Sequence, residues 1–275
     1  MPKTLHFLRT LAVCITVLAL GSISSVVLAW KADKLSPWVG ETLEGKPCAG
    51  LLVGFGPYDY LQRASLPGAL EVVEESHFNE DVESLKNGQT SSIVNDIHYT
   101  LSAWPNHHRA LNSIRRYRLE RMGAWPDDAT VPPAECYLRR AMKFSPNDPR
   151  PYMMYGLLMH KAAQYDEALL AYQAVIRLLP NDIMTQYNMG LTLVALEKYP
   201  EAQAIAEKVY AAGIPLPGLK RKLIEAGHWK SPADAVARKD AQQATAGVTT
   251  EAQPAKAASP DETTKETTTA KKATP

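Results

Sequence analysis

The sequence predicts an all-α fold built from repeated pairs of helices. Residue types recur at a fixed offset of 34 positions, pairing Gly156 with Gly190, Tyr165 with Tyr199, Glu167 with Glu201, and Ala168 with Ala202. Pro-Asn dipeptides begin at positions 105, 146 and 180, which are 41 and 34 residues apart. A period of this length is typical of a solenoid, in which each helical pair buries its apolar face only against its neighbours.

The clearest repeating units span residues 149–182 and 183–217. In the first unit, Tyr152, Gly156 and Met159 share one helical face because they fall at i, i+4 and i+7. Gly156 and its partner Ala168 are small enough to let two antiparallel helices approach closely. We therefore expect each unit to be a helical hairpin.

Both units resemble the tetratricopeptide repeat. That family's pattern is an aromatic residue, then an apolar residue followed by Gly, then Ala-x3-aromatic, and finally Pro. The stretch from Tyr187 to Ala202 is similar to the family's first helix and turn. The second unit departs from the pattern at Gln186, Ala206 and Ile214. A terminal unit that packs on one side only can tolerate such changes.

The resemblance implies a concave groove lined by fixed positions of each unit's first helix. These positions are Met153, Leu157, His160, Lys161, Tyr187, Asn188, Leu191 and Val194. Asn188 matches the asparagine with which such domains hold a peptide backbone or carboxylate, but Met154 stands there in the first unit, so a complete carboxylate clamp is not expected. The methionines of the first unit either form an adaptable apolar floor or fill the core.

Residues 71–148 predict degenerate helical repeats ahead of the clear ones. We expect a helix pair over 109–121 and 134–144, separated by the proline-rich stretch 123–133, which cannot continue a helix. Arg115 stands where the clear units carry their packing glycine, so this pair must splay or be rebuilt.

The flanks of the array differ in composition. Residues 31–70 are rich in Gly, Pro and Trp and predict an irregular segment, with Tyr58 and Tyr60 packed onto the first helices. Its glycines lack the strand and the lysine of a phosphate-binding loop. Residues 218–229 predict a capping helix, and the Ala-, Thr-, Lys- and Glu-rich stretch 230–275 predicts a disordered tail.

Residues 1–30 predict a targeting segment. Lys3 and Arg9 precede an uncharged run over 10–30, and Ala29 ends a plausible cleavage site. A cleaved signal peptide would place the chain in a bacterial periplasm. An uncleaved signal anchor would hold it in the inner membrane facing the periplasm, since about 20 residues span a bilayer core of about 30 Å. Both alternatives fit the sequence.

Export brings an oxidising compartment, which makes Cys48 and Cys136 the cysteines of interest. They either form a disulfide that ties the N-terminal segment to the repeats or remain as two buried thiols.

Several kinds of chemistry find no support in the sequence. A net charge of +1 disfavours a nucleic-acid partner. His107 and His108 are adjacent, point about 100° apart on a helix and cannot share an ion in the usual i, i+4 way. No nucleophile motif occurs. We therefore expect no catalytic residue, no metal, no cofactor and no enzymatic activity.

One basic stretch is a candidate partner surface. Its residues are Arg109, Arg115, Arg116, Arg118 and Arg121, with Arg139, Arg140 and Lys143 on the next helix. Arg115 and Arg116 are candidate partner-binding residues within it, and an acidic peptide, anionic lipid or acidic polysaccharide would suit such a face. A solvated, salt-bridged face is the alternative.

The resulting functional prediction is a non-enzymatic scaffold or assembly factor of the bacterial envelope that binds an envelope protein or peptide segment in its groove. The alternative is a structural subunit of a secretion, pilus or polysaccharide-export complex, anchored through residues 10–30 and without a peptide groove. The two differ in whether the groove residues are exposed.

Overall fold

The computed structural model describes residues 36–121, 125 and 130–229. Its helices are the 3-10 helix η1 (Tyr60–Ser65) and the α-helices α2 (Pro67–His77), α3 (Glu80–Glu83), α4 (Ile93–Ala103), α5 (His108–Glu120), α6 (Ala134–Phe144), α7 (Pro149–Lys161), α8 (Tyr165–Leu178), α9 (Ile183–Ala195), α10 (Tyr199–Ala211) and α11 (Gly218–Glu225). Within these residues the only β feature is an isolated bridge between Glu41 and Pro47. The all-α class is confirmed there, and the predicted targeting segment 1–30 and tail 230–275 lie outside the described residues.

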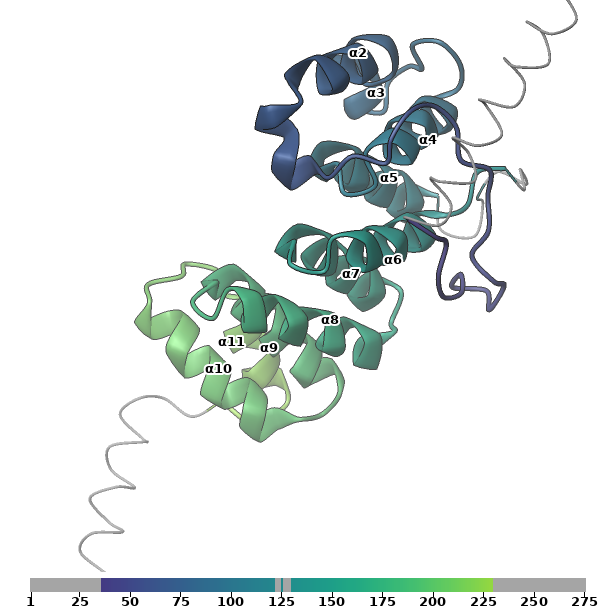
Figure 1. The fold of residues 1–275 in the computed structure, drawn as a ribbon. Helices are drawn as coiled ribbons and strands as arrows, with labels where there is room; N and C mark the ends of the chain where they lie inside the picture. Colours follow the sequence, from purple (N-terminus) through teal and green to yellow (C-terminus); the bar gives the residue numbers. More distant parts are fainter. Residues whose placement is uncertain (1–35, 122–124, 126–129, 230–275) are drawn as a thin grey trace, which may run out of the picture. The chain divides into compact units, whose positions relative to one another are not determined.

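Helices that follow one another along the chain also pack against one another from α4 to α11 (Figure 1). The odd-numbered helices from α5 onward also contact one another: α5 packs against α7, α7 against α9, and α9 against α11. These four helices therefore form one row of neighbours, and α6, α8 and α10 each pack between two of its members.

One turn occurs before three helices of this row. Its closing hydrogen bond runs from His107 N to Trp104 O at 3.0 Å, from Asp148 N to Ser145 O at 3.0 Å, and from Asp182 N to Leu179 O at 3.1 Å. The donor residue in each case is the N-cap of the following helix. The Pro-Asn dipeptides of the sequence thus mark the same turn, used three times.

The turns inside the last two hairpins also match. Ala163 and Glu197 are both left-handed, with φ of 58°. The next amide closes the turn in each case, Gln164 N to Met159 O and Lys198 N to Leu193 O, both at 2.9 Å. Backbone geometry therefore repeats with the same 34-residue period as the residue types.

Two glycines allow the close helix contacts that the sequence predicts. A Cβ atom at Gly156 would lie 2.6 Å from Cε1 of Tyr172 in α8. A Cβ atom at Gly190 would lie 2.6 Å from a methyl carbon of Leu219 in α11 and 3.2 Å from one of Ile205 in α10. Real Cβ atoms essentially never lie 2.6 Å from another heavy atom, so a side chain at either position would force its neighbour to shift.

The buried apolar side chains form a core that follows the row of helices. One cluster includes Ile97, Leu111 and Leu138 and extends to Tyr172 in α8. A second cluster extends from Leu169 to α11. Met189 packs against both clusters, so the two cores join at α9.

The N-terminal segment 36–50 is fastened onto α5 and α6. Cys48 and Cys136 form a disulfide across 88 residues of sequence. The amide of Leu43 donates to Oε1 of Glu135 at 3.0 Å, and Arg140 donates to the carbonyl of Ser36 at 2.8 Å. The segment is irregular, as expected, but it is anchored at several points.

The following stretch contains more helix than the sequence suggested. The expected irregular segment 31–70 in fact ends in η1 and the first turn of α2, because Asp59 caps η1 by accepting from Leu61 N and Pro67 pre-sets the helical backbone at the start of α2. Tyr58 and Tyr60 pack on Trp104 with ring centroids 5.1 and 6.3 Å apart. Their predicted packing on the first helices is confirmed.

Candidate functional site

The predicted groove residues lie on two neighbouring helices of the row. Met153, Leu157, His160 and Lys161 lie on α7, and Tyr187, Asn188, Leu191 and Val194 lie on α9. Lys161 is exposed, Tyr187 is buried, and the others are half-buried. We call the set without Tyr187 the α7–α9 face.

His160 joins the two helices at the centre of this face. Its Nδ1 lies 2.8 Å from Oγ1 of Thr192 on α9. That hydroxyl already donates to the carbonyl of Asn188 at 3.0 Å, so it must accept from an Nδ1–H of His160. The tautomer is thereby set, and Nε2 of the neutral ring is left as a hydrogen-bond acceptor.

The electrostatics around His160 are positive. Burial lowers the pKa of His160, and the nearby charges of Lys161 and Lys222 lower it further. Lys222 comes from α11, where Lys220 and Arg221 precede it. Both lysines are exposed, so two positive charges lie near His160 at this end of the α7–α9 face.

The prediction that Tyr187 lines an open groove is wrong. The ring is only 8% exposed and belongs to the core between α9 and α11. A Cβ atom on Gly218 would lie 2.6 Å from the tyrosine hydroxyl, which shows how closely the start of α11 covers it. The capping helix α11 packs where a further repeat would pack. The residue pattern of α9 alone does not indicate that this later helix covers Tyr187.

The other end of the face opens into a pocket of about 670 Å³ between the start of α7, the end of α8 and the start of α9. Its lining includes Met153, Val175 and Leu178, with Arg150 and Asp182 as charged members. Leu179 and Met184 are 45% and 43% exposed there. We call this site the Met153 pocket.

Arg115 and Arg116 do not belong to one basic face. Arg115 is half-buried, with Nη2 donating to Asn112 Oδ1 at 2.8 Å, and burial together with the Arg116 charge lowers its pKa. The side chain of Arg116 reaches the carbonyl of Glu83 at 3.5 Å. Arg118 lies inside the protein, 1% exposed.

Most of the other arginines of that stretch are also occupied. Buried Arg118 is paired with Glu135 and Glu44. Arg109 pairs with Glu74 and Glu83, and Arg139 pairs with Glu167. The predicted basic surface is therefore divided. Arg118 is paired inside the protein, where Glu44 of segment 36–50 reaches it, whereas Arg109 and Arg139 form partly exposed ion pairs.

The adjacent histidines contribute to folding. His107 is the N-cap of α5, with Nδ1 accepting from Ala110 N at 3.1 Å and Nε2 2.8 Å from Glu74. His108 contacts Asp148, the N-cap of α7, at 2.8 Å. Among the described residues, no three His, Cys, Asp or Glu side chains are placed to hold a metal ion.

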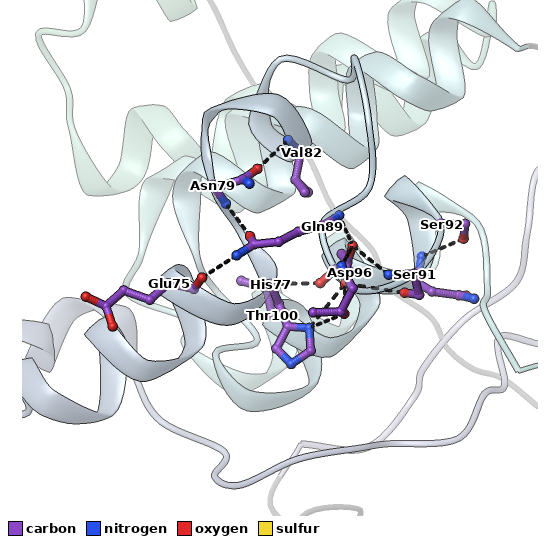
Figure 2. A network of polar contacts seen from close by, with 11 residues as sticks. Glu75, His77, Asn79, Val82, Gln89, Ser91, Ser92, Asp96 and Thr100 are labelled. Atoms are coloured by element: carbon purple, nitrogen blue, oxygen red, sulfur yellow. Dashed lines mark hydrogen bonds and ion pairs between the residues drawn. The ribbon is translucent and has the colours of Figure 1, made fainter.

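Sequence reasoning missed one polar site, formed by His77 and Asp96 (Figure 2). Nδ1 of His77 lies 3.1 Å from Oδ1 of Asp96, although the residues are 19 positions apart. A Thr-Ser-Ser run at 90–92 directly before the helix of Asp96 was the available signal, because hydroxyl and amide donors cluster at a helix start.

Comparison with known proteins gives no assignment: no protein-family model matches the chain, and no curated protein matches it. Of the helices in the described ranges, none is long and apolar enough to span a membrane. The run 10–30, which was the predicted anchor, lies outside those ranges.

Proposed function

We propose that this chain is an exported helical-repeat protein of the tetratricopeptide type that binds a segment of another envelope protein along the α7–α9 face. The observation that carries the proposal is the combination, on one helix, of the Met153 pocket at the start of α7 and a positive region at its end. The first supplies apolar contact, and the second supplies a partner for an acidic group.

The repeat assignment is supported by backbone geometry as well as by residue types. Left-handed Ala163 and Glu197 are 34 residues apart, and the turn before α9 follows the turn before α7 by the same interval. Contacts within the row α5, α7, α9 and α11 have the order expected of stacked hairpins.

The spacing of the two ends suggests the size of the bound segment. Met153 and Lys161 are eight residues apart on α7, which corresponds to about 12 Å along a helix. An extended peptide covers this distance in about four residues. We therefore expect an apolar side chain about four residues from an acidic side chain or a free carboxyl terminus.

The polar residues between these ends can hold the peptide backbone. Nε2 of neutral His160 can accept a backbone N–H, and the half-buried amide of Asn188 can both donate and accept. Asn188 is the position that matches the family's backbone-holding asparagine. Because Tyr187 is buried, it takes no part in this contact.

A charge-reversal experiment tests the proposal. Proteins crosslinked to the chain in its native envelope are compared for wild type, the Lys161→Glu/Lys222→Glu variant, and a matched Lys198→Glu/Lys208→Glu variant at the N-cap and in the last turn of α10. All four lysines are exposed, and both variants change the charge equally. We expect loss of a crosslinked acidic segment in the first variant only.

The same experiment separates the two functional classes. An unchanged set of crosslinked segments in both variants, with an intact N-terminus on the captured chain, would overturn the peptide-binding proposal. That result would favour the anchored structural subunit of a secretion, pilus or polysaccharide-export complex.

A further inference from the structure

A second, smaller pocket lies away from the α7–α9 face. It has a volume of about 170 Å³, and its walls come from the turn before η1, from α2 and from α4. Its lining includes Phe55, Tyr58, Val72, Val73, His77 and Tyr99. We call it the His77 pocket.

The imidazole of His77 is held from one side. Its Nδ1 lies 3.1 Å from Oδ1 of Asp96 (Figure 2) and 3.1 Å from Oγ1 of Thr90. The side chain of Asp96 is fully buried and also accepts from the backbone amides of Gln89 at 2.6 Å and Thr90 at 3.0 Å. Burial raises the pKa of Asp96, but hydrogen bonds from Thr90, His77 and these amides outweigh it and bring the pKa to about 2.

This arrangement sets the tautomer of His77. An ionised carboxylate can only accept hydrogen bonds, so Nδ1 of His77 carries a hydrogen. The neutral ring then presents Nε2 as an acceptor. Within the described part of the chain, Nε2 has no hydrogen-bond partner.

The ring is also fixed in orientation. It stacks on Tyr99, with ring centroids 3.8 Å apart and an interplanar angle of 25°. Tyr99 in turn packs against Gly54, where a Cβ atom would lie 2.8 Å from its Cζ atom. His77 therefore lines the pocket with a ring of fixed orientation, and the other walls are mostly apolar and aromatic.

We propose that the His77 pocket binds one phenol ring, with the phenol hydroxyl donating to Nε2 of His77. The volume suits one aromatic ring, since an apolar protein cavity of about 150 Å³ holds benzene. The hydroxyl is needed because an apolar ring would leave Nε2 without a partner after water is displaced.

The rim indicates how the ring is presented. Phe55 and Val72 are 64% and 62% exposed, so the pocket opens to solvent and leaves room for a group attached to the ring. The tyrosine side chain of another polypeptide is a phenol that carries such an attached group. This site is separate from the α7–α9 face, and its failure would leave the peptide-binding proposal as it stands.

Titration of the purified full chain with p-cresol, the analogue of a tyrosine side chain, tests the inference, and toluene is the matched ring without a hydroxyl. Amide chemical shifts report both position and affinity. We expect saturable shifts at Val73 and Tyr99, with p-cresol binding about three- to tenfold more tightly than toluene. In His77→Phe this preference should disappear.

Two exposed positions provide a control that leaves the His77–Asp96 contact intact. Val72→Arg at the rim should abolish p-cresol binding, whereas Ile224→Arg on α11, 54% exposed, should leave it unchanged. The inference is overturned by equal affinities for p-cresol and toluene in wild type, by shifts that do not saturate, or by unchanged binding in Val72→Arg.

Discussion

Ala163 and Glu197 occupy the same left-handed backbone conformation, with φ of 58°, at equivalent turns of two successive hairpins. Each is followed by an amide that bonds back into the preceding helix at 2.9 Å. A left-handed conformation is unfavourable for residues with a Cβ atom. The turn therefore carries a local free-energy cost in both hairpins. Substitutions at these two residues test the geometry of the turn.

Replacing either residue with glycine should stabilise the protein. Ala163→Gly and Glu197→Gly should each raise the free energy of unfolding by up to about 1 kcal/mol, because relief of strain exceeds the added entropy of the unfolded chain. The control is Ala204→Gly in the exposed middle of α10, which should cost about 1 kcal/mol. Urea unfolding measures all three, and destabilisation by all three would contradict the turn geometry.

The packing glycine of the first clear hairpin should not tolerate a methyl group. Gly156→Ala should lower the free energy of unfolding by about 1–3 kcal/mol, because the new Cβ would lie 2.6 Å from the buried ring of Tyr172. Gly68→Ala in α2 is the matched control, since nothing lies within 4 Å of its Cβ position. Thermal unfolding should show no loss for Gly68→Ala, and equal losses for both variants would argue against the close helix contact.

Reduction of the Cys48–Cys136 disulfide should destabilise the protein. The bond closes a loop with a sequence separation of 88, so its loss should lower the free energy of unfolding by about 4.6 kcal/mol through the entropy of the unfolded chain. Urea unfolding with and without a reductant gives the difference. In Cys48→Ser/Cys136→Ser the reductant should have no effect, and the same absence of effect in wild type would contradict the bond.

The hydrogen bonds that Asp96 accepts from Thr90, His77 and backbone amides should make the stability of the protein depend on pH in the acidic range. The folded-state pKa of Asp96 is about 2, below its ordinary value of 3.8. Its carboxylate therefore contributes stability that is fully present above about pH 4 and is lost as pH falls to about 2. Asp96→Asn should lower the free energy of unfolding by about 2 kcal/mol at pH 7. In urea unfolding, this difference from wild type should become smaller as the pH falls from about 4 to about 2. A difference in the free energy of unfolding that does not change with pH would contradict the lowered pKa of Asp96.

The sequence was sufficient where local chemistry decides the structure. The helix expected over 134–144 begins and ends at Ala134 and Phe144, because Pro133 ends the irregular stretch before it and the Ser145–Asp148 turn follows it. The Pro-Asn dipeptides at 105, 146 and 180 likewise mark the three turns that precede α5, α7 and α9.

The sequence was insufficient where segments distant in sequence meet. Tyr187 was expected in a groove and is covered by α11, and Arg118 was expected on a surface and is buried under Glu44. Nothing within either helix records which later or earlier segment packs on it. The pairing of His77 with Asp96 depends in the same way on a loop that returns α4 to the end of α2.

The most direct test of the peptide-binding account is site-specific photocrosslinking in the native envelope. A photoreactive residue is placed at Met184 in the Met153 pocket or at Leu170 on α8, which are 43% and 64% exposed. The account predicts that position 184 crosslinks to an apolar residue of the partner that lies about four positions from an acidic group. It predicts no crosslink from position 170. No crosslink at 184, or equal crosslinks at both positions, would contradict it.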